Sequence, residues 1–132
     1  MRFMLLQNYG GIEGDCAPMY EWTREEVAAH VQFQMTLNRQ LEELGELIDG
    51  QGLAGPDEAR YVVSDGTTPF VTDGPFPEAK ELLAGYRIVE VDTPERAVEI
   101  AAQISAAPGQ GGAPIRQRIE VRQVMAAPDP EV

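Results

Sequence analysis

One predicted helix carries a line of polar side chains whose types and spacing suit acid–base chemistry. His30 is the only histidine of the 132-residue chain, and Gln34 and Asn38 follow it at intervals of four residues. Side chains spaced by four share one face of an α-helix, and this face lies among apolar residues that should meet a sheet. Burying such groups without partners costs several kcal/mol, which a polar cavity avoids. The line therefore predicts a pocket between helix and sheet, in which Gln34 and Asn38 orient a ligand.

His30 itself has two open interpretations. As a functional residue it is a general acid or base, because imidazole changes its charge near neutral pH. As a structural residue it is a partly buried histidine whose nitrogens bond the backbone or water. Tyr9, at the end of the first predicted strand, could add a hydroxyl group to the same site.

Asp73 opens the sequence Asp73-Gly74-Pro75-Phe76, which is typical of a rigid turn. In a turn, aspartate accepts local backbone hydrogen bonds, glycine takes a positive φ and proline fixes the next φ. Phe76 is then expected to be a buried anchor. The alternative places Asp73 at the mouth of the pocket, as the carboxylate that orients His30 and forms a catalytic pair with it.

The basic residues near these segments also have two interpretations. Lys80 lies between Glu78 and Glu81, so it is either part of an exposed, salt-bridged helix start or the positive charge for an anionic ligand. Arg87 and Arg122 fall in predicted strands and are expected to face solvent. If they faced the cavity instead, they could hold a carboxylate through two hydrogen bonds.

Motifs for cofactors and metals do not match this sequence. The glycine-rich stretch 109–112 lacks the Gly-Lys-Ser/Thr ending of a phosphate loop and follows a helix rather than a strand. One histidine and one cysteine far apart argue against a zinc site. Cys16 has no basic neighbour to activate it, so no role is expected for it. We therefore expect no cofactor and no metal, and chemistry of the lyase or isomerase type that needs only proton transfer.

The elements that must position these residues follow from periodicity and capping signals. Thr23 and Glu26 form a capping box at the start of the first long helix, and Pro94 marks the start of the second. The predicted helices span about 23–44, 78–83 and 94–104, and loops span 10–22 and 105–114. The predicted strands are 2–9, 47–53 (with a glycine bulge), 59–63, 69–72 and 85–91, with a last one inside 115–125.

This order predicts an α+β fold of the ferredoxin-like βαβ–βαβ type with an extra hairpin. Two helices would cover one face of the sheet. A second copy of the chain is the usual cover for the other face, so a homodimer is expected.

Composition and charge narrow the functional classes. Hydrophobic residues make up 43% of the chain, enough for one domain, which we place at 1–125 with a loose tail at 126–132. The net charge of −12 disfavours direct binding to nucleic acid or to an anionic membrane. No apolar run is long enough to cross a bilayer, and the first nine residues read as a strand rather than a signal peptide. A single cysteine excludes an internal disulfide and favours a cytoplasmic location.

The sequence resembles the DGPF group of YCII-related proteins. The resemblance rests on Val71–Phe76 with its Asp-Gly-Pro-Phe motif, on Glu78, Lys80-Glu81 and Gly85-Tyr86, and on both ends of the chain, so it covers about residues 2–125. Matching segments elsewhere are Phe3-Met4-Leu5-Leu6, Gly45-Glu46-Leu47, Asp49-Gly50-Gln51-Gly52-Leu53 and Ile119–Met125.

The resemblance implies a dimeric α+β barrel, in which the sheets of two chains pack face to face. Some members of the group keep a histidine in the first helix, and a His–Asp pair would match the activity suspected for related proteins. A few relatives are enzymes, including a dehydrochlorinase-type lyase. Others are encoded beside extracytoplasmic-function sigma factors. The resemblance thus leaves two functions open, an enzyme acting on a small molecule and a regulatory protein acting through a protein partner.

Overall fold

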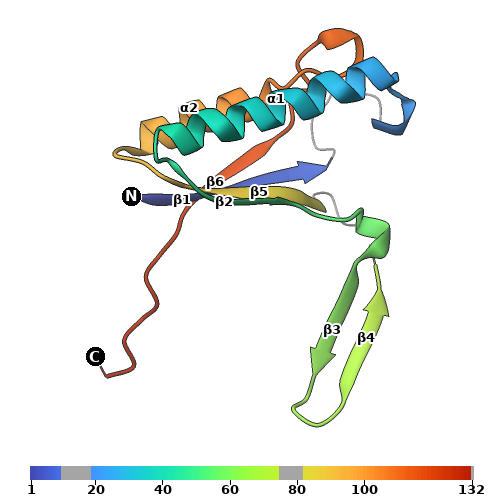
Figure 1. The fold of residues 1–132 in the computed structure, drawn as a ribbon. Coiled ribbons are helices and arrows are strands. Elements are labelled where there is room, and N and C mark those ends of the chain that lie inside the picture. Colours follow the sequence, from blue (N-terminus) through green and yellow to red (C-terminus); the bar gives the residue numbers. More distant parts are fainter. Residues whose placement is uncertain (10–18, 75–81, 132) are drawn as a thin grey trace.

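Two helices lie side by side on one face of a four-stranded sheet (Figure 1). This computed structural model describes residues 1–9, 19–74 and 82–131. The helices are α1 (Arg24–Glu43) and α2 (Pro94–Ser105). The sheet has the order β2-β5-β1-β6 and is formed by β1 (Arg2–Tyr9), β2 (Leu47–Gly52), β5 (Leu82–Glu90) and β6 (Ile119–Gln123).

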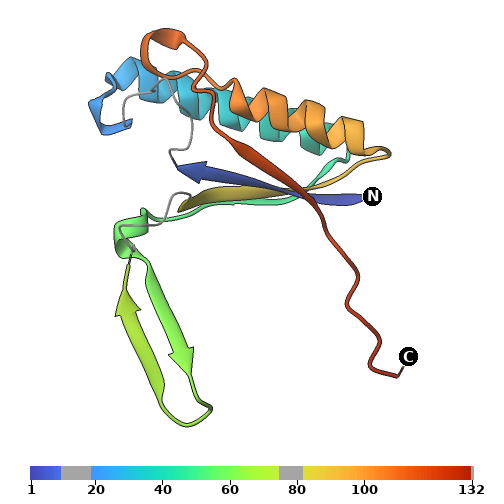
Figure 2. The same ribbon diagram turned by 180° about the vertical axis from the view of Figure 1, so that it is seen from behind.

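The connectivity is that of a ferredoxin-like fold, as the sequence predicts. Each neighbouring pair of strands in the sheet is antiparallel. β1 and β2 therefore run parallel on either side of β5, and α1 connects them. In the same way, β5 and β6 flank β1 and are connected by α2. Both connections pass over the same face of the sheet, which leaves the opposite face without helices (Figures 1 and 2).

Both long helices begin at the residues that the capping signals indicate. The Thr23 hydroxyl accepts a hydrogen bond from the Glu26 backbone at 3.1 Å, and the Glu26 carboxylate accepts one from the Thr23 backbone at 2.8 Å. This reciprocal capping box satisfies two backbone N–H groups of the first turn. Thr93 caps α2 with its hydroxyl alone, which accepts from the Arg96 backbone at 3.2 Å, and Pro94 lies in the first turn. The second carboxylate oxygen of Glu26 accepts from the Gly111 backbone, which ties loop 106–114 to α1.

The core lies between the helices and the sheet. Alternate residues of the strands face the helices, so Leu5 and Val89 are fully buried against Leu41 of α1 and against Ile100 and Ile104 of α2. Along α1, the buried residues are Leu37 and Leu41. Val31 and Leu44 are exposed instead, because the polar line of the helix takes up part of the sheet-facing side.

A hairpin inserted between β2 and β5 projects away from the sheet on the side opposite the helices (Figures 1 and 2). It consists of β3 (Arg60–Ser64) and β4 (Pro69–Asp73). In its turn Gly66 has a φ of +95°, and the Asp65 carboxylate accepts from the Thr67 and Thr68 backbones at 2.9 Å each. These two hydrogen bonds lower the pKa of Asp65. The apolar side chains of both strands are exposed.

Three local predictions need correction. Leu82 and Leu83 belong to β5 and not to a helix, because they pair with Tyr9 and Asn8 of β1; residues 78–81 lie outside the described residues. The irregularity of β2 falls at Ile48, since Gly50 and Gly52 pair regularly with β5.

Gly74 is the third correction, because its φ is not positive. Asp73 closes β4 by pairing with Arg60, and the Gly74 backbone donates to the Ala59 carbonyl at 2.9 Å. Glycine is needed here for a different reason: an added Cβ would overlap the ring of Tyr61.

Short 3-10 turns complete the description, at Met19–Glu21, Pro56–Glu58 and Gln110–Gly112. Within the described ranges, no helix combines the length and apolar character that crossing a membrane requires.

Candidate functional site

A pocket of about 390 Å³ lies between α1 and the end of the sheet formed by β2 and β5. This volume falls in the range of small-molecule sites. Most of the described residues that line it have polar side chains, and Met19 and Leu53 are apolar residues that line it while remaining nearly half exposed. The described residues that line it are Gln7, Met19, His30, Gln34, Asn38, Gly50, Gln51, Gly52, Leu53, Ala84, Tyr86, Arg87 and Gln117.

Arg87 is the buried cation of this pocket, and only 4% of it is exposed. Its Nε donates to the Asn38 side-chain oxygen at 2.8 Å, and its Nη2 donates to the Gln34 side-chain oxygen at 2.6 Å. Burial lowers the pKa of Arg87, but a guanidinium keeps its charge because its ordinary pKa lies far above neutrality. Both acceptors are neutral amides, so neither supplies a negative charge to balance the cation.

Gly50 gives this arginine its place on the sheet. It pairs with Arg87 across β2 and β5, and a Cβ at Gly50 would come within 3.1 Å of the Arg87 Cγ. The arginine stem therefore lies directly against the β2 backbone, where a larger residue would push it aside.

His30 is held in one neutral tautomer. Its Nδ1 lies 3.0 Å from the Pro108 carbonyl oxygen, which can only accept, so Nδ1 carries the proton. The lone pair then resides on Nε2, where the Gln34 side-chain nitrogen approaches at 3.4 Å and donates. The basic nitrogen of the ring is thus the one on the Gln34 side, among the residues that line the pocket.

Gln34 connects the histidine to the arginine. Its oxygen accepts from Arg87, and its nitrogen therefore faces His30, so a single amide orientation satisfies both contacts. The resulting series of hydrogen bonds runs from Arg87 through Gln34 and His30 to the Pro108 carbonyl. Such a series fixes the rotamers of its members, which is the pre-organisation that a binding or catalytic site requires.

Trp22 contacts His30 but is not part of this series of hydrogen bonds. Its ring lies edge-on to that of His30, with centroids 5.5 Å apart and planes inclined by 68°. Trp22 is the only tryptophan of the chain. Its fluorescence therefore reports directly on the surroundings of His30.

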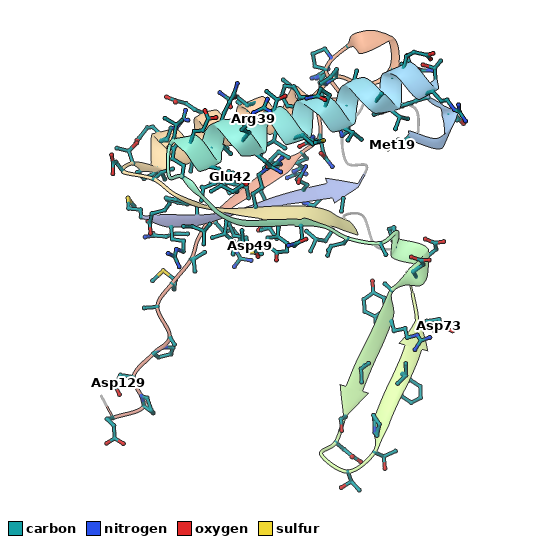
Figure 3. All side chains as sticks on the ribbon, viewed as in Figure 1. Met19, Arg39, Glu42, Asp49, Asp73 and Asp129 are labelled. Carbon is teal, nitrogen blue, oxygen red and sulfur yellow. The ribbon has the colours of Figure 1, made fainter. Side chains whose placement is uncertain are left out.

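Hydrogen bonds also join the strands that border the pocket: the Tyr86–Asp49 bond lies on the helix-free face of the sheet, opposite Arg87, and the Gln7–Gln117 bond lies in the pocket wall (Figure 3). The Tyr86 hydroxyl donates to the Asp49 carboxylate at 2.8 Å, and this bond raises the pKa of Tyr86 and lowers that of Asp49. Gln117 accepts from the Gln7 side chain at 3.4 Å and donates to the Asn8 carbonyl at 3.2 Å. These contacts join β2 to β5, and β1 to the segment before β6, around the pocket.

The structure brings together only part of the predicted site. His30, Gln34 and Asn38 face the sheet and line one pocket, as their spacing predicts. Asp73 does not meet His30 within the chain: it is exposed on the projecting hairpin, on the other side of the sheet from the helices (Figure 3). The inserted hairpin carries it there, so the expected His–Asp pair is not formed within one chain.

The remaining predicted residues lie outside the described residues or on the surface. Tyr9 ends β1 and pairs with Leu82, but its side chain is outside what the structure describes. Lys80, Phe76 and Cys16 also lie outside the described residues. The side chain of Arg122 is 73% exposed beside Glu120, which agrees with the expected surface position.

Arg87 is the main residue whose orientation is the opposite of the prediction, since it points into the pocket rather than into solvent. Its alternation with Val89 on β5 places both on the helix side. Tyr86 and Ile88, on the other face of β5, are at least as apolar as Arg87 and Val89. The sequence pattern of β5 alone therefore could not show which face meets the helices.

A family model for the YCII-related domain matches residues 1–118. The chain belongs to the YCII-related family. A comparison with curated proteins gives no match. In this YCII-related chain the matched span contains every residue that lines the pocket, from Gln7 to Gln117. Among the residues that the structure describes, no cluster of histidine, cysteine and carboxylate side chains has the arrangement of a metal site.

Proposed function

We propose that this protein binds a small organic molecule in the pocket beneath α1 and transfers a proton to and from it without a cofactor, as a lyase or isomerase does. The observation that carries the proposal is the state of His30. Its Nδ1 is committed to the Pro108 carbonyl, and its basic Nε2 lies beside Gln34 in the pocket wall. A neutral imidazole with a fixed lone pair is the form that a general base needs.

Arg87 complements this base electrostatically. Removal of a proton by His30 leaves negative charge on the bound molecule, and the guanidinium lies one amide away, on the other side of Gln34. A buried cation stabilises developing negative charge more strongly than an exposed one, because the surrounding dielectric is low. The protonated imidazole then returns the proton to a different atom, which completes an isomerisation, or to a leaving group, which completes an elimination.

Deuterium exchange tests this function without knowledge of the substrate. The protein is incubated in D₂O with a panel of 2-oxo acids and 1,3-dicarbonyl compounds, and the loss of carbon-bound protons is followed by ¹H NMR. We expect accelerated exchange for at least one compound, and loss of that acceleration in His30→Asn. Gln32→Asn, on the exposed side of α1, serves as the control and should exchange like the wild type. Exchange that is unchanged in His30→Asn, or absent throughout the panel, would overturn the proposal.

We further propose that the protein works as a cytoplasmic homodimer. The β3–β4 hairpin supports this, because an isolated two-stranded hairpin is marginal in water and needs a surface to pack on. Its apolar side chains are unusually exposed, with Val63 and Phe70 each at 70%. The helix-free face of the sheet, where Met4 and Ile88 lie, is the available surface of a second copy.

Light scattering tests the assembly. We expect twice the chain mass of 14.5 kDa at micromolar concentration, and the chain mass itself for a Val63→Lys, Phe70→Lys double variant. A wild type that runs at 14.5 kDa would overturn the homodimer.

The same exposed hairpin favours one alternative function, a non-enzymatic regulatory role through contact with a different protein. The net charge of −12 would suit a basic partner, such as an extracytoplasmic-function sigma factor. A monomeric wild type that co-purifies with such a factor would support this alternative over the enzyme.

A further inference from the structure

We propose that the molecule taken by the pocket is a small organic acid with a single carboxylate, held by the guanidinium of Arg87. The inference rests on the proposed function in one respect, that the pocket is a small-molecule site, and it names the class of ligand. It is carried by the charge balance and hydrogen bonding of Arg87 rather than by the chemistry of His30.

The positive charge of Arg87 has no carboxylate partner among the described residues. A buried cation is stable when a carboxylate pairs with it, and among the described residues Arg87 pairs with none. The chain has 22 acidic residues and a net charge of −12, so unpaired carboxylates are abundant on its surface. The described part of the pocket wall nevertheless supplies only amides around the guanidinium, and Asp49 lies on the opposite face of the sheet, bound to the Tyr86 hydroxyl. A ligand carboxylate would supply the missing charge.

The guanidinium of Arg87 also has N–H groups that the described residues do not use. A guanidinium has five N–H groups, and the described residues bind one on Nε and one on Nη2. The two N–H groups of Nη1 and the second of Nη2 donate to none of the described residues. One N–H of Nη1 and the second of Nη2 form the end-on edge of the guanidinium, which binds the two oxygens of a carboxylate through parallel hydrogen bonds. Asn38 and Gln34 thus hold the arginine by one edge and leave the edge that recognises carboxylate available.

The residues that line the pocket also favour a ligand with a single negative charge. Among the described lining residues Arg87 is the only arginine or lysine, so in this part of the wall a phosphate dianion would retain an unbalanced charge in a partly buried site. Met19 and Leu53 line the same pocket and are 46% and 42% exposed. They offer apolar contact to the body of an acid whose carboxylate reaches Arg87.

Paired ligands test the proposal. Acetate, benzoate and 3-phenylpropionate are compared with their primary amides and with inorganic phosphate, and binding is followed by Trp22 fluorescence and by NMR shifts of the Arg87 and Gln34 backbone amides. We expect at least one acid to bind ten-fold or more tightly than its amide, and more tightly than phosphate. No saturable binding of any acid up to 10 mM, equal binding of acid and amide, or preference for phosphate would each overturn it.

Two matched variants distinguish an effect at Arg87 from an effect of the net charge of the protein on acid binding. Gln34→Glu keeps the side-chain size and places a carboxylate against Arg87, so it should weaken binding of the acid ten-fold or more while leaving the amide unaffected. Gln32→Glu adds the same charge on the exposed side of α1 and should change neither. Equal loss in both variants, or no loss in Gln34→Glu, would refute the role of Arg87.

The outcomes are distinguishable from failure of the proposed function. If acids bind at Arg87 but His30→Asn does not alter deuterium exchange, the ligand class stands and the proton transfer does not. If amides bind as well as acids and exchange depends on His30, the proton transfer stands and the ligand class does not.

Discussion

Asn38 provides the clearest quantitative test of the pocket's internal hydrogen bonds. In Asn38→Leu, the Nε–H of the buried Arg87 loses its acceptor at 2.8 Å. Hydrogen bonds to charged groups contribute about 1.5–3 kcal/mol. The leucine regains up to about 1 kcal/mol by burying additional apolar surface at this half-buried position. We therefore expect a net loss of about 1–2 kcal/mol in the free energy of unfolding.

The measurement is urea unfolding followed by circular dichroism at one protein concentration, because assembly would make stability depend on concentration. Gln40→Leu is the control, since Gln40 lies exposed on the same helix, and it should change stability by no more than about 0.5 kcal/mol. In the double variant Asn38→Leu, Arg87→Met the charge is gone, and the cost of Asn38→Leu should fall by about 1 kcal/mol. An Asn38→Leu protein as stable as Gln40→Leu would refute the reasoning.

Three further predictions concern other parts of the molecule. Glu46 accepts two hydrogen bonds from Arg96, at 2.8 and 2.9 Å, which lower the pKa of Glu46. A carboxyl whose pKa is lower in the folded state stabilises the protein at pH values above its unfolded pKa of about 4.3, and this stabilisation is lost as the pH falls through the folded pKa. Arg96→Met should therefore lower the free energy of unfolding by about 1 kcal/mol at pH 7 and by less at pH 3. An equal loss at both pH values, measured by urea unfolding, would contradict the role of this ion pair. Gly74→Val should lower the melting temperature more than Gly52→Val, measured by calorimetry, because a side chain at Gly74 meets the ring of Tyr61 whereas the position of a Cβ at Gly52 is open; equal melting temperatures would contradict this contact. Trp22 fluorescence should differ between the wild type and His30→Gln at one pH, because the substitution removes the imidazole ring 5.5 Å away; identical emission from the two proteins would contradict the pairing.

Local signals predicted most of the fold correctly. The capping box at Thr23 and Glu26 and the proline at Pro94 are satisfied by contacts within one helical turn, so the sequence alone determines them. The ferredoxin-like order followed from the alternation of strands and helices. Within the site, the helical spacing of His30, Gln34 and Asn38 was sufficient to place all three toward the sheet.

What could not be predicted depends on contacts between distant segments. The direction of Arg87 requires knowing which face of β5 meets the helices, and both faces carry apolar residues. The position of Asp73 depends on the direction in which the hairpin leaves the sheet, which no turn signal records. The tautomer of His30 depends on the Pro108 carbonyl, which is 78 residues away in the chain.

The strand order β2-β5-β1-β6 has a consequence for how the protein is made. β1 is synthesised before both of its neighbours in the sheet, β5 and β6, although it is a central strand. During translation α1 and the β3–β4 hairpin can form locally, while both edges of β1 stay unpaired. Pairings between the two ends of a chain slow folding, because the loop entropy must be overcome before the contacts form. We therefore expect the sheet, and with it the Arg87 and Pro108 contacts of the pocket, to assemble only after β6 has emerged from the ribosome.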